Sequence, residues 1–147
     1  QAYSDVRLFN ALAGNLVNVT DESVDAHVSF IFEELSETIT AVESGDRVEL
    51  LDGACDLFVT VAGLMQKLEA QGYDVARAIE RVNENNLSKF PKNVLAADAN
   101  NPDYVVTLND QYSRYVIKDK TTGKVKKPAD FAGVYLTDLI PSRKVSA

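Results

Sequence analysis

Two neighbouring stretches of the chain carry acidic residues at helical spacing. The first is E-E-L-S-E over residues 33–37, and the second is E-L-L-D over residues 49–52, followed by Asp56. At about 100° per residue, side chains three or four positions apart lie on one face of a helix. Like charges at this spacing repel, so a convergent cluster needs cations or protons to neutralise it. Carboxylate ligands of this kind select Mg²⁺, with Mn²⁺ as a common substitute.

The net charge of −7 is unevenly distributed along the chain. Residues 21–56 hold eleven acidic residues against Arg47 alone, a sum of −10, whereas residues 112–147 hold eight basic residues against three acidic ones, a sum of +5. The negative total disfavours general nucleic-acid binding. An acidic centre with a basic tail suits an anionic ligand that cations and basic groups hold jointly. A solvated acidic helix face is the alternative, and both interpretations stay open at this point.

Apolar residues recur every three or four positions through the first two-thirds of the chain, which is typical of amphipathic helices. The predicted helices cover residues 3–13, 22–44, 47–70 and 74–89. Thr20 is suited to cap the second of these helices, and Asp46 the third. Short loops between long helices favour antiparallel neighbours, so we predict a mainly α fold built as an antiparallel helical bundle.

The pattern changes after Pro91. Residues 115–117 are β-branched and aromatic, and Thr121-Thr122-Gly123 is a turn signal, so we predict a β-hairpin over residues 113–127. The length of 147 residues suits a single domain. Within it we expect a helical core over residues 1–90 and a loop and hairpin extension over residues 91–147 that packs on the core.

Several classes of protein are excluded by what the sequence lacks. No apolar run approaches the roughly 20 residues of a membrane span. The single cysteine, Cys55, cannot form an internal disulfide, which favours a reducing, cytoplasmic setting. A carboxylate-bridged di-iron site needs Glu-x-x-His, but the only histidine, His27, follows Val24. An EF-hand fails because the stretch from Asp98 to Asp110 lacks the glycine required at loop position 6 and the glutamate required at position 12.

The acidic pattern resembles the signature of the all-α nucleoside triphosphate pyrophosphohydrolases. This superfamily includes the MazG-type enzymes, the dimeric dUTPases and the phosphoribosyl-ATP pyrophosphohydrolases. Residues 81–90, RVNENNLSKF, are similar to the S-N-M-S-K helix end of phage and bacterial members, with Asn85 and Leu87 in place of the usual Ser and Met. Residues 123–128, GKVKKP, and residues 135–139, YLTDL, resemble the "G-K-V-x-K-P … A-D-L" ending of the same phage-type subgroup.

The resemblance implies Mg²⁺-dependent hydrolysis of a (d)NTP to the monophosphate and pyrophosphate. Its implied metal ligands are Glu34, Glu37, Glu49 and Asp52. Glu33 or Glu37 is expected to orient the attacking water or accept its proton. The residues expected to contact substrate are Asp56, Asn83, Asn86, Lys89, Lys124 and Lys126. Lys89 can instead complement a helix C-terminus, and the two tail lysines can instead protect an edge strand.

The expected partners are a nucleoside triphosphate and further copies of the chain, as a homodimer or homotetramer, with neither nucleic acid nor a membrane. The small core and the resemblance both favour such self-association. Nucleotide-pool control or housekeeping is the expected role. Phosphoribosyl-ATP hydrolysis is the alternative reaction. A non-catalytic module that binds or senses nucleotides is the alternative class.

Overall fold

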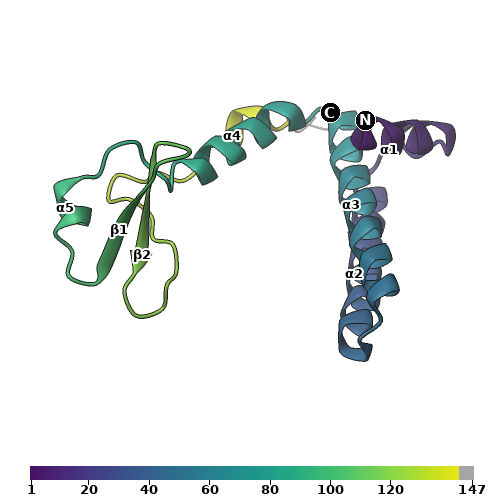
Figure 1. Ribbon diagram of the computed structural model, residues 1–147. Coiled ribbons are helices and arrows are strands. Elements are labelled where there is room, and N and C mark those ends of the chain that lie inside the picture. The colour runs from purple at the N-terminus through teal and green to yellow at the C-terminus, as the bar shows by residue number, and fades with distance from the viewer. Residues whose placement is uncertain (143–147) are drawn as a thin grey trace. The chain divides into compact units, whose positions relative to one another are not determined.

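The computed structural model describes residues 1–142, which form two compact units (Figure 1). Gln1–Val75 and the described residues from Leu139 onward make up the first unit, and Ala76–Asp138 make up the second. Helices dominate the fold, and one antiparallel hairpin lies in the C-terminal part of the chain. The predicted fold class is therefore confirmed. None of the helices within residues 1–142 is both long and apolar enough to cross a membrane.

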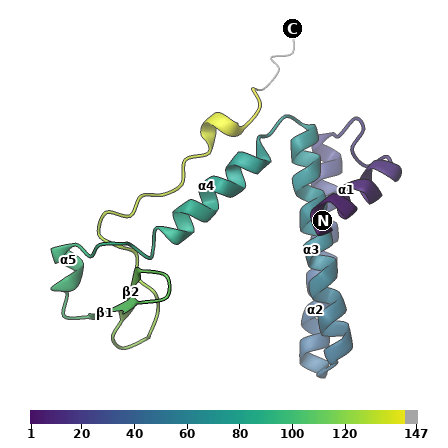
Figure 2. The same cartoon turned by 45° about the horizontal axis from the view of Figure 1, so that its top comes forward.

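The first unit is built on two long helices, α2 (Asp21–Ser44) and α3 (Arg47–Ala70), which lie antiparallel side by side (Figures 1 and 2). The predicted caps are present. Thr20 forms a capping box with Ser23 at the start of α2, and Oδ1 of Asp46 accepts the N–H of Glu49 at 3.0 Å. Gly45 adopts φ +71° in the two-residue connection, a left-handed conformation that glycine enters without steric penalty.

The seam between α2 and α3 is lined by residues at heptad-like spacing. On α2 these are Val24, His27, Ile31, Glu34, Thr38 and Ala41, and on α3 they are Gly53, Asp56, Thr60, Gly63 and Lys67. Nε2 of His27 lies 2.6 Å from the backbone oxygen of Thr60, so this histidine forms a polar contact across the seam. Few of these side chains are large and apolar, so the seam is unusually polar for a helix pair.

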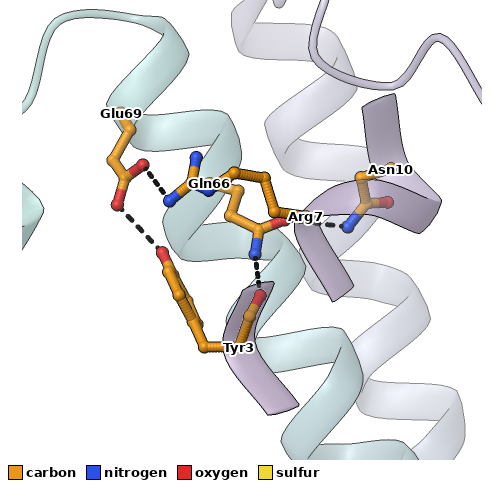
Figure 3. Close-up of polar contacts among 5 residues, drawn as sticks. All are labelled: Tyr3, Arg7, Asn10, Gln66 and Glu69. Atoms are coloured by element: carbon orange, nitrogen blue, oxygen red, sulfur yellow. Dashed lines mark hydrogen bonds and ion pairs between the residues drawn. The ribbon is translucent and has the colours of Figure 1, made fainter. Parts of the chain in front are cut away.

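Helix α1 (Ala2–Leu12) is fastened to the C-terminal half of α3 by polar side chains (Figure 3). The Tyr3 hydroxyl and the Arg7 guanidinium both donate to the Glu69 carboxylate, at 2.9 and 2.7 Å. Nδ2 of Asn10 donates to Oε1 of Gln66 at 3.1 Å, and Nε2 of Gln66 donates to the backbone oxygen of Tyr3 at 3.1 Å. Because Gln66 and Asn10 are buried, these bonds satisfy groups that would otherwise be costly to desolvate.

The second unit contains most of α4 (Val75–Leu87), the short α5 (Ala96–Ala99) and a hairpin of β1 (Tyr104–Asn109) and β2 (Arg114–Asp119). The strands pair antiparallel from Tyr104 opposite Asp119 to Asn109 opposite Arg114. Ile117 of β2 is fully buried and marks the centre of this unit's small core.

The hairpin predicted over residues 113–127 forms only in part. β2 pairs with β1 across a turn at residues 110–113, and Val125 forms only an isolated bridge with Lys118. The Thr121-Thr122-Gly123 signal does mark a turn, in which Oδ1 of Asp119 accepts the N–H groups of Thr121 and Thr122. That turn leads into the bridge rather than into a second full strand.

The segment after the hairpin runs beside α4 within the second unit (Figure 2). Nδ2 of Asn85 donates to the oxygen of Ala132 at 2.6 Å, and Arg81 binds both carboxylate oxygens of Asp138 at 2.6 and 2.9 Å. These contacts group α4 with the hairpin and the tail. The expected division into residues 1–90 and 91–147 stays a prediction.

A 3₁₀ turn, η1 (Thr137–Leu139), ends the described regular structure.

Candidate functional site

Five carboxylates gather on one side of the α2–α3 seam. Glu34 and Glu37 come from α2, and Glu49, Asp52 and Asp56 come from α3. Partial burial of Glu34 is the largest cause that raises its pKa, and the charges of Glu37, Asp56, Glu33 and Asp52 raise that pKa further. The α2 and α3 acids therefore act on one another across the seam, as their helical spacing suggested.

A close approach of the two helices brings these acids together. Gly53 of α3 packs directly against Thr38 of α2, so that a Cβ atom placed on Gly53 would lie 2.5 Å from Oγ1 of Thr38. Gly53 follows Asp52, and Thr38 follows Glu37 in the sequence. The absence of a side chain at Gly53 thus sets how near the α2 acids come to the α3 acids.

A groove of about 370 Å³ continues this acidic side toward the loop between the helices. Its lining residues are Glu37, Thr40, Ala41, Ser44, Asp46 and Glu49. Glu37 and Glu49 face it from opposite helices, and hydroxyl groups supply neutral oxygen atoms. An open, oxygen-rich groove of this kind matches the ligand preference of a hard cation.

The donor set fits Mg²⁺ in its chemistry. Within residues 1–142, no three His, Cys, Asp or Glu side chains converge closely enough in their present conformations to hold an ion by themselves. Mg²⁺ usually keeps several waters and takes only one or two carboxylates together with substrate phosphates. Glu33, which is exposed, adds its charge to the acidic side without lining the groove.

The remaining predicted site residues belong to the second unit. Asn83 and Asn86 are exposed on α4, and Nζ of Lys89 donates to Oδ1 of Asn86 at 3.3 Å. Lys124 and Lys126 flank the isolated bridge, where the oxygen of Lys124 accepts the N–H of Asp119 and the N–H of Lys126 donates to Ile117. The structure therefore brings Asn86 and Lys89 together at the end of α4, and the two tail lysines together beside β2.

Several residues that line or support these sites were not identified from the sequence. Thr40 and Ser44 follow Glu37 by three and seven positions, and this helical spacing could have identified both. Arg81 and Asp138 are far apart in the sequence, and no local pattern indicates that they pair. The same holds for Arg114, whose guanidinium donates to the Phe90 oxygen at 3.0 Å.

The E-E-x-x-E and E-x-x-D patterns lie on the two antiparallel helices α2 and α3, and they resemble the pattern of the all-α pyrophosphohydrolases. A family comparison agrees: residues 17–86 match the family described as phosphoribosyl-ATP pyrophosphohydrolase. The match covers a helical region of just under half of the chain and supports its resemblance to the MazG-like all-α nucleoside triphosphate pyrophosphohydrolase superfamily. It contains α2, α3, nearly all of α4 and every carboxylate of the acidic side. No curated protein and no solved structure matches the chain.

Proposed function

We propose that the chain hydrolyses a nucleoside or deoxynucleoside triphosphate to the monophosphate and pyrophosphate, with Mg²⁺ as its cofactor. The observation that carries this proposal is the crowding of five carboxylates along one side of the α2–α3 seam, within the region that matches the family. Such crowding costs stability unless cations offset it, which is the arrangement expected of a site that works with a metal.

The roles follow from the position of each residue. Glu34, Glu37, Glu49 and Asp52 would hold Mg²⁺, which when bound neutralises phosphate oxygens and supplies an activated water. Glu33, at the exposed margin, or Glu37 would orient that water and accept its proton. No side-chain nucleophile is needed, and His27 is already engaged with the backbone of Thr60.

The substrate contacts are a separate part of the proposal. Asn86 and Lys89 offer an amide and a cation at the end of α4, and Lys124 and Lys126 add positive charge beside β2. Asp56 and Asn83 are proposed to contact the sugar or base. A cytoplasmic location and a role in nucleotide-pool control belong to the same proposal.

Phosphoribosyl-ATP is the second candidate substrate, because the matching family carries that description. Both reactions break the bond between the α- and β-phosphorus atoms and release pyrophosphate. They differ in the organic product, so chromatography of the products separates them.

The test is a screen of the common NTPs, dNTPs and phosphoribosyl-ATP with Mg²⁺, with pyrophosphate as the readout. We expect turnover that disappears with excess chelator, and a fall of at least about a hundredfold in Asp52→Asn. Glu43→Gln is the matched control, because Glu43 is an exposed acid of α2 outside the groove and the seam. Full turnover in chelator, release of a diphosphate, or normal turnover in Asp52→Asn would each contradict the proposal.

We also propose that a second copy of the chain covers the other side of the α2–α3 seam. At helical spacing, exposed apolar residues form a stripe beside the seam on α2, and Leu50 and Val61 continue it on α3. The α2 residues of this stripe are Val28, Phe32, Leu35, Ile39 and Val42. A contiguous apolar face of two antiparallel helices is the surface that four-helix packing between identical chains would bury. Metal binding and self-association are thus assigned to opposite sides of the α2–α3 helix pair.

A further inference from the structure

One residue of the short connection between α2 and α3, Asp46, hydrogen-bonds to both helices. Its backbone N–H donates to the oxygen of Ala41, in the last turn of α2, at 3.0 Å. In the first turn of α3, its backbone oxygen accepts the N–H of Leu50 at 2.9 Å, and its side-chain Oδ1 accepts the N–H of Glu49 at 3.0 Å. Asp46 therefore holds the end of one helix and the start of the next in a fixed relation.

Asp46 also lines the groove that Glu37 and Glu49 face from opposite helices. Glu49 is the third residue of α3, so the turn that the Asp46 side chain caps is the turn that carries this carboxylate. The first turn of a helix depends on such a cap, because its N–H groups have no partner within the helix. The position of the Glu49 carboxylate relative to Glu37 thus depends on the bond that Asp46 makes.

We propose that Asp46 is a positioning residue for the cation of the proposed reaction, which holds Glu49 opposite Glu37 through its cap and is not itself a ligand. The inference rests on the proposed function, in which both glutamates hold the metal. Oδ1 of Asp46 already accepts the N–H of Glu49, and Mg²⁺ usually takes only one or two carboxylates together with waters and phosphates. Removing a group that orients a metal ligand typically lowers metal affinity about 10–100-fold.

The experiment measures the binding of Mn²⁺ to the full chain by EPR, without any nucleotide. Asp46→Ala removes the cap and should weaken Mn²⁺ binding about tenfold. Asp46→Asn and Asp46→Ser lose the charge but keep a side-chain oxygen that caps a helix well, so their affinity should stay within about threefold of the wild type. Amide hydrogen exchange at Glu49, followed by NMR, should become faster in Asp46→Ala and stay slow in Asp46→Asn.

Thr20→Ala is the matched control, because Thr20 caps α2 in the same way and lies at the opposite end of that helix from the groove. Its side chain accepts the N–H of Ser23 at 3.1 Å. Thr20→Ala should lower the midpoint of urea unfolding about as much as Asp46→Ala does, and should leave Mn²⁺ binding unchanged. A loss of affinity in Asp46→Ala alone then reports the position of Glu49 and not the stability of the fold.

The results separate this inference from the proposed function. An affinity that is lost in Asp46→Ala and retained in Asp46→Asn supports the positioning role, even if no triphosphate is hydrolysed. Equal losses in these two variants would overturn it, because the charge and not the cap would then control the metal. Wild-type affinity in Asp46→Ala, or an equal loss in Thr20→Ala, would also overturn it, even if Mg²⁺-dependent release of pyrophosphate continues. A wild-type chain that binds no Mn²⁺ would overturn both the inference and the metal cofactor of the proposed function.

Discussion

Replacing Gly53 by alanine tests whether the close approach of α2 and α3 controls the acidic side. The added methyl group would lie 2.5 Å from Oγ1 of Thr38, 3.2 Å from its Cβ and 3.4 Å from its Cα. Non-bonded heavy atoms essentially never come within 3.0 Å of a Cβ atom, so the helices must separate or Thr38 must change its rotamer. The hydroxyl of Thr38 also donates a hydrogen bond to the backbone oxygen of Glu34 at 2.8 Å, and a change of rotamer would break that bond.

The expected loss of stability can be worked out from opposing terms. Overpacking at a helix contact costs about 1–3 kcal/mol. Alanine in place of glycine within a helix returns up to about 1 kcal/mol through its propensity. The net expectation is a decrease of about 1–2 kcal/mol in the free energy of unfolding. Because Gly53 adjoins Asp52, the same displacement should weaken Mg²⁺-dependent turnover more than the stability loss alone predicts.

Urea unfolding and steady-state pyrophosphate release measure the two effects, and Thr38→Ala provides the internal check. Removing Oγ1 eliminates the closest contact and leaves the Cβ contact at 3.2 Å, so the double variant should recover part of the loss. Gly133→Ala is the matched control, because nothing lies within 4 Å of a Cβ atom placed there. A Gly53→Ala chain that is as stable and active as the wild type would refute the role assigned to this contact.

Two further predictions concern the two sides of the helix pair. Glu34→Gln should raise the free energy of unfolding of the metal-free chain at pH 7 by a few tenths of a kcal/mol, as expected when repulsion from like-charged neighbours is removed. Because the pKa of Glu34 is raised in the fold, protonation of Glu34 at low pH relieves the repulsion in the wild type as well. The extra free energy of unfolding of Glu34→Gln should therefore disappear below about pH 4. Urea unfolding at several pH values in which this difference persists at low pH would contradict the prediction. Ile39→Lys should shift the chain from dimer to monomer in light scattering, whereas Leu108→Lys should not, although the two side chains are 48% and 49% exposed; a dimer that survives Ile39→Lys would show that the apolar face is not the interface.

The helices could be predicted from the sequence because local signals determine their limits. Apolar periodicity fixed their extent, and capping residues such as Thr20 and Asp46 fixed their starts. The β1–β2 turn carries no glycine in its Asp110–Ser113 sequence, and Ser113 adopts φ +53° there. The usual hairpin signal was absent at the true turn and present at the later one, which explains the displaced prediction.

The candidate site was only partly accessible to the same reasoning. The acidic stripes follow from spacing within each helix. How closely the acidic stripes of α2 and α3 approach each other depends on the packing of Gly53 against Thr38. The packing of α1 on α3 depends on the hydrogen bond between Asn10 and Gln66, which are 56 positions apart in the sequence. Contacts between distant residues leave no periodic signal in one sequence. The catalytic and metal-binding roles of the acids stay predictions.

The composition of the α2–α3 seam explains why a bound cation and a second copy of the chain should both stabilise this helix pair. Acids and small polar residues occupy positions of the α2–α3 seam where a stable hairpin of helices would place leucine or isoleucine. In residues 1–142, the buried apolar side chains are few, whereas many of the larger apolar side chains of α2 and α3 remain exposed. A seam that is weak for these reasons gains stability when charge is neutralised on one side and apolar surface is buried on the other. We therefore expect Mg²⁺ and self-association each to raise the unfolding temperature, and Glu34→Gln to reduce the increase due to Mg²⁺ while leaving the increase due to dimerisation intact.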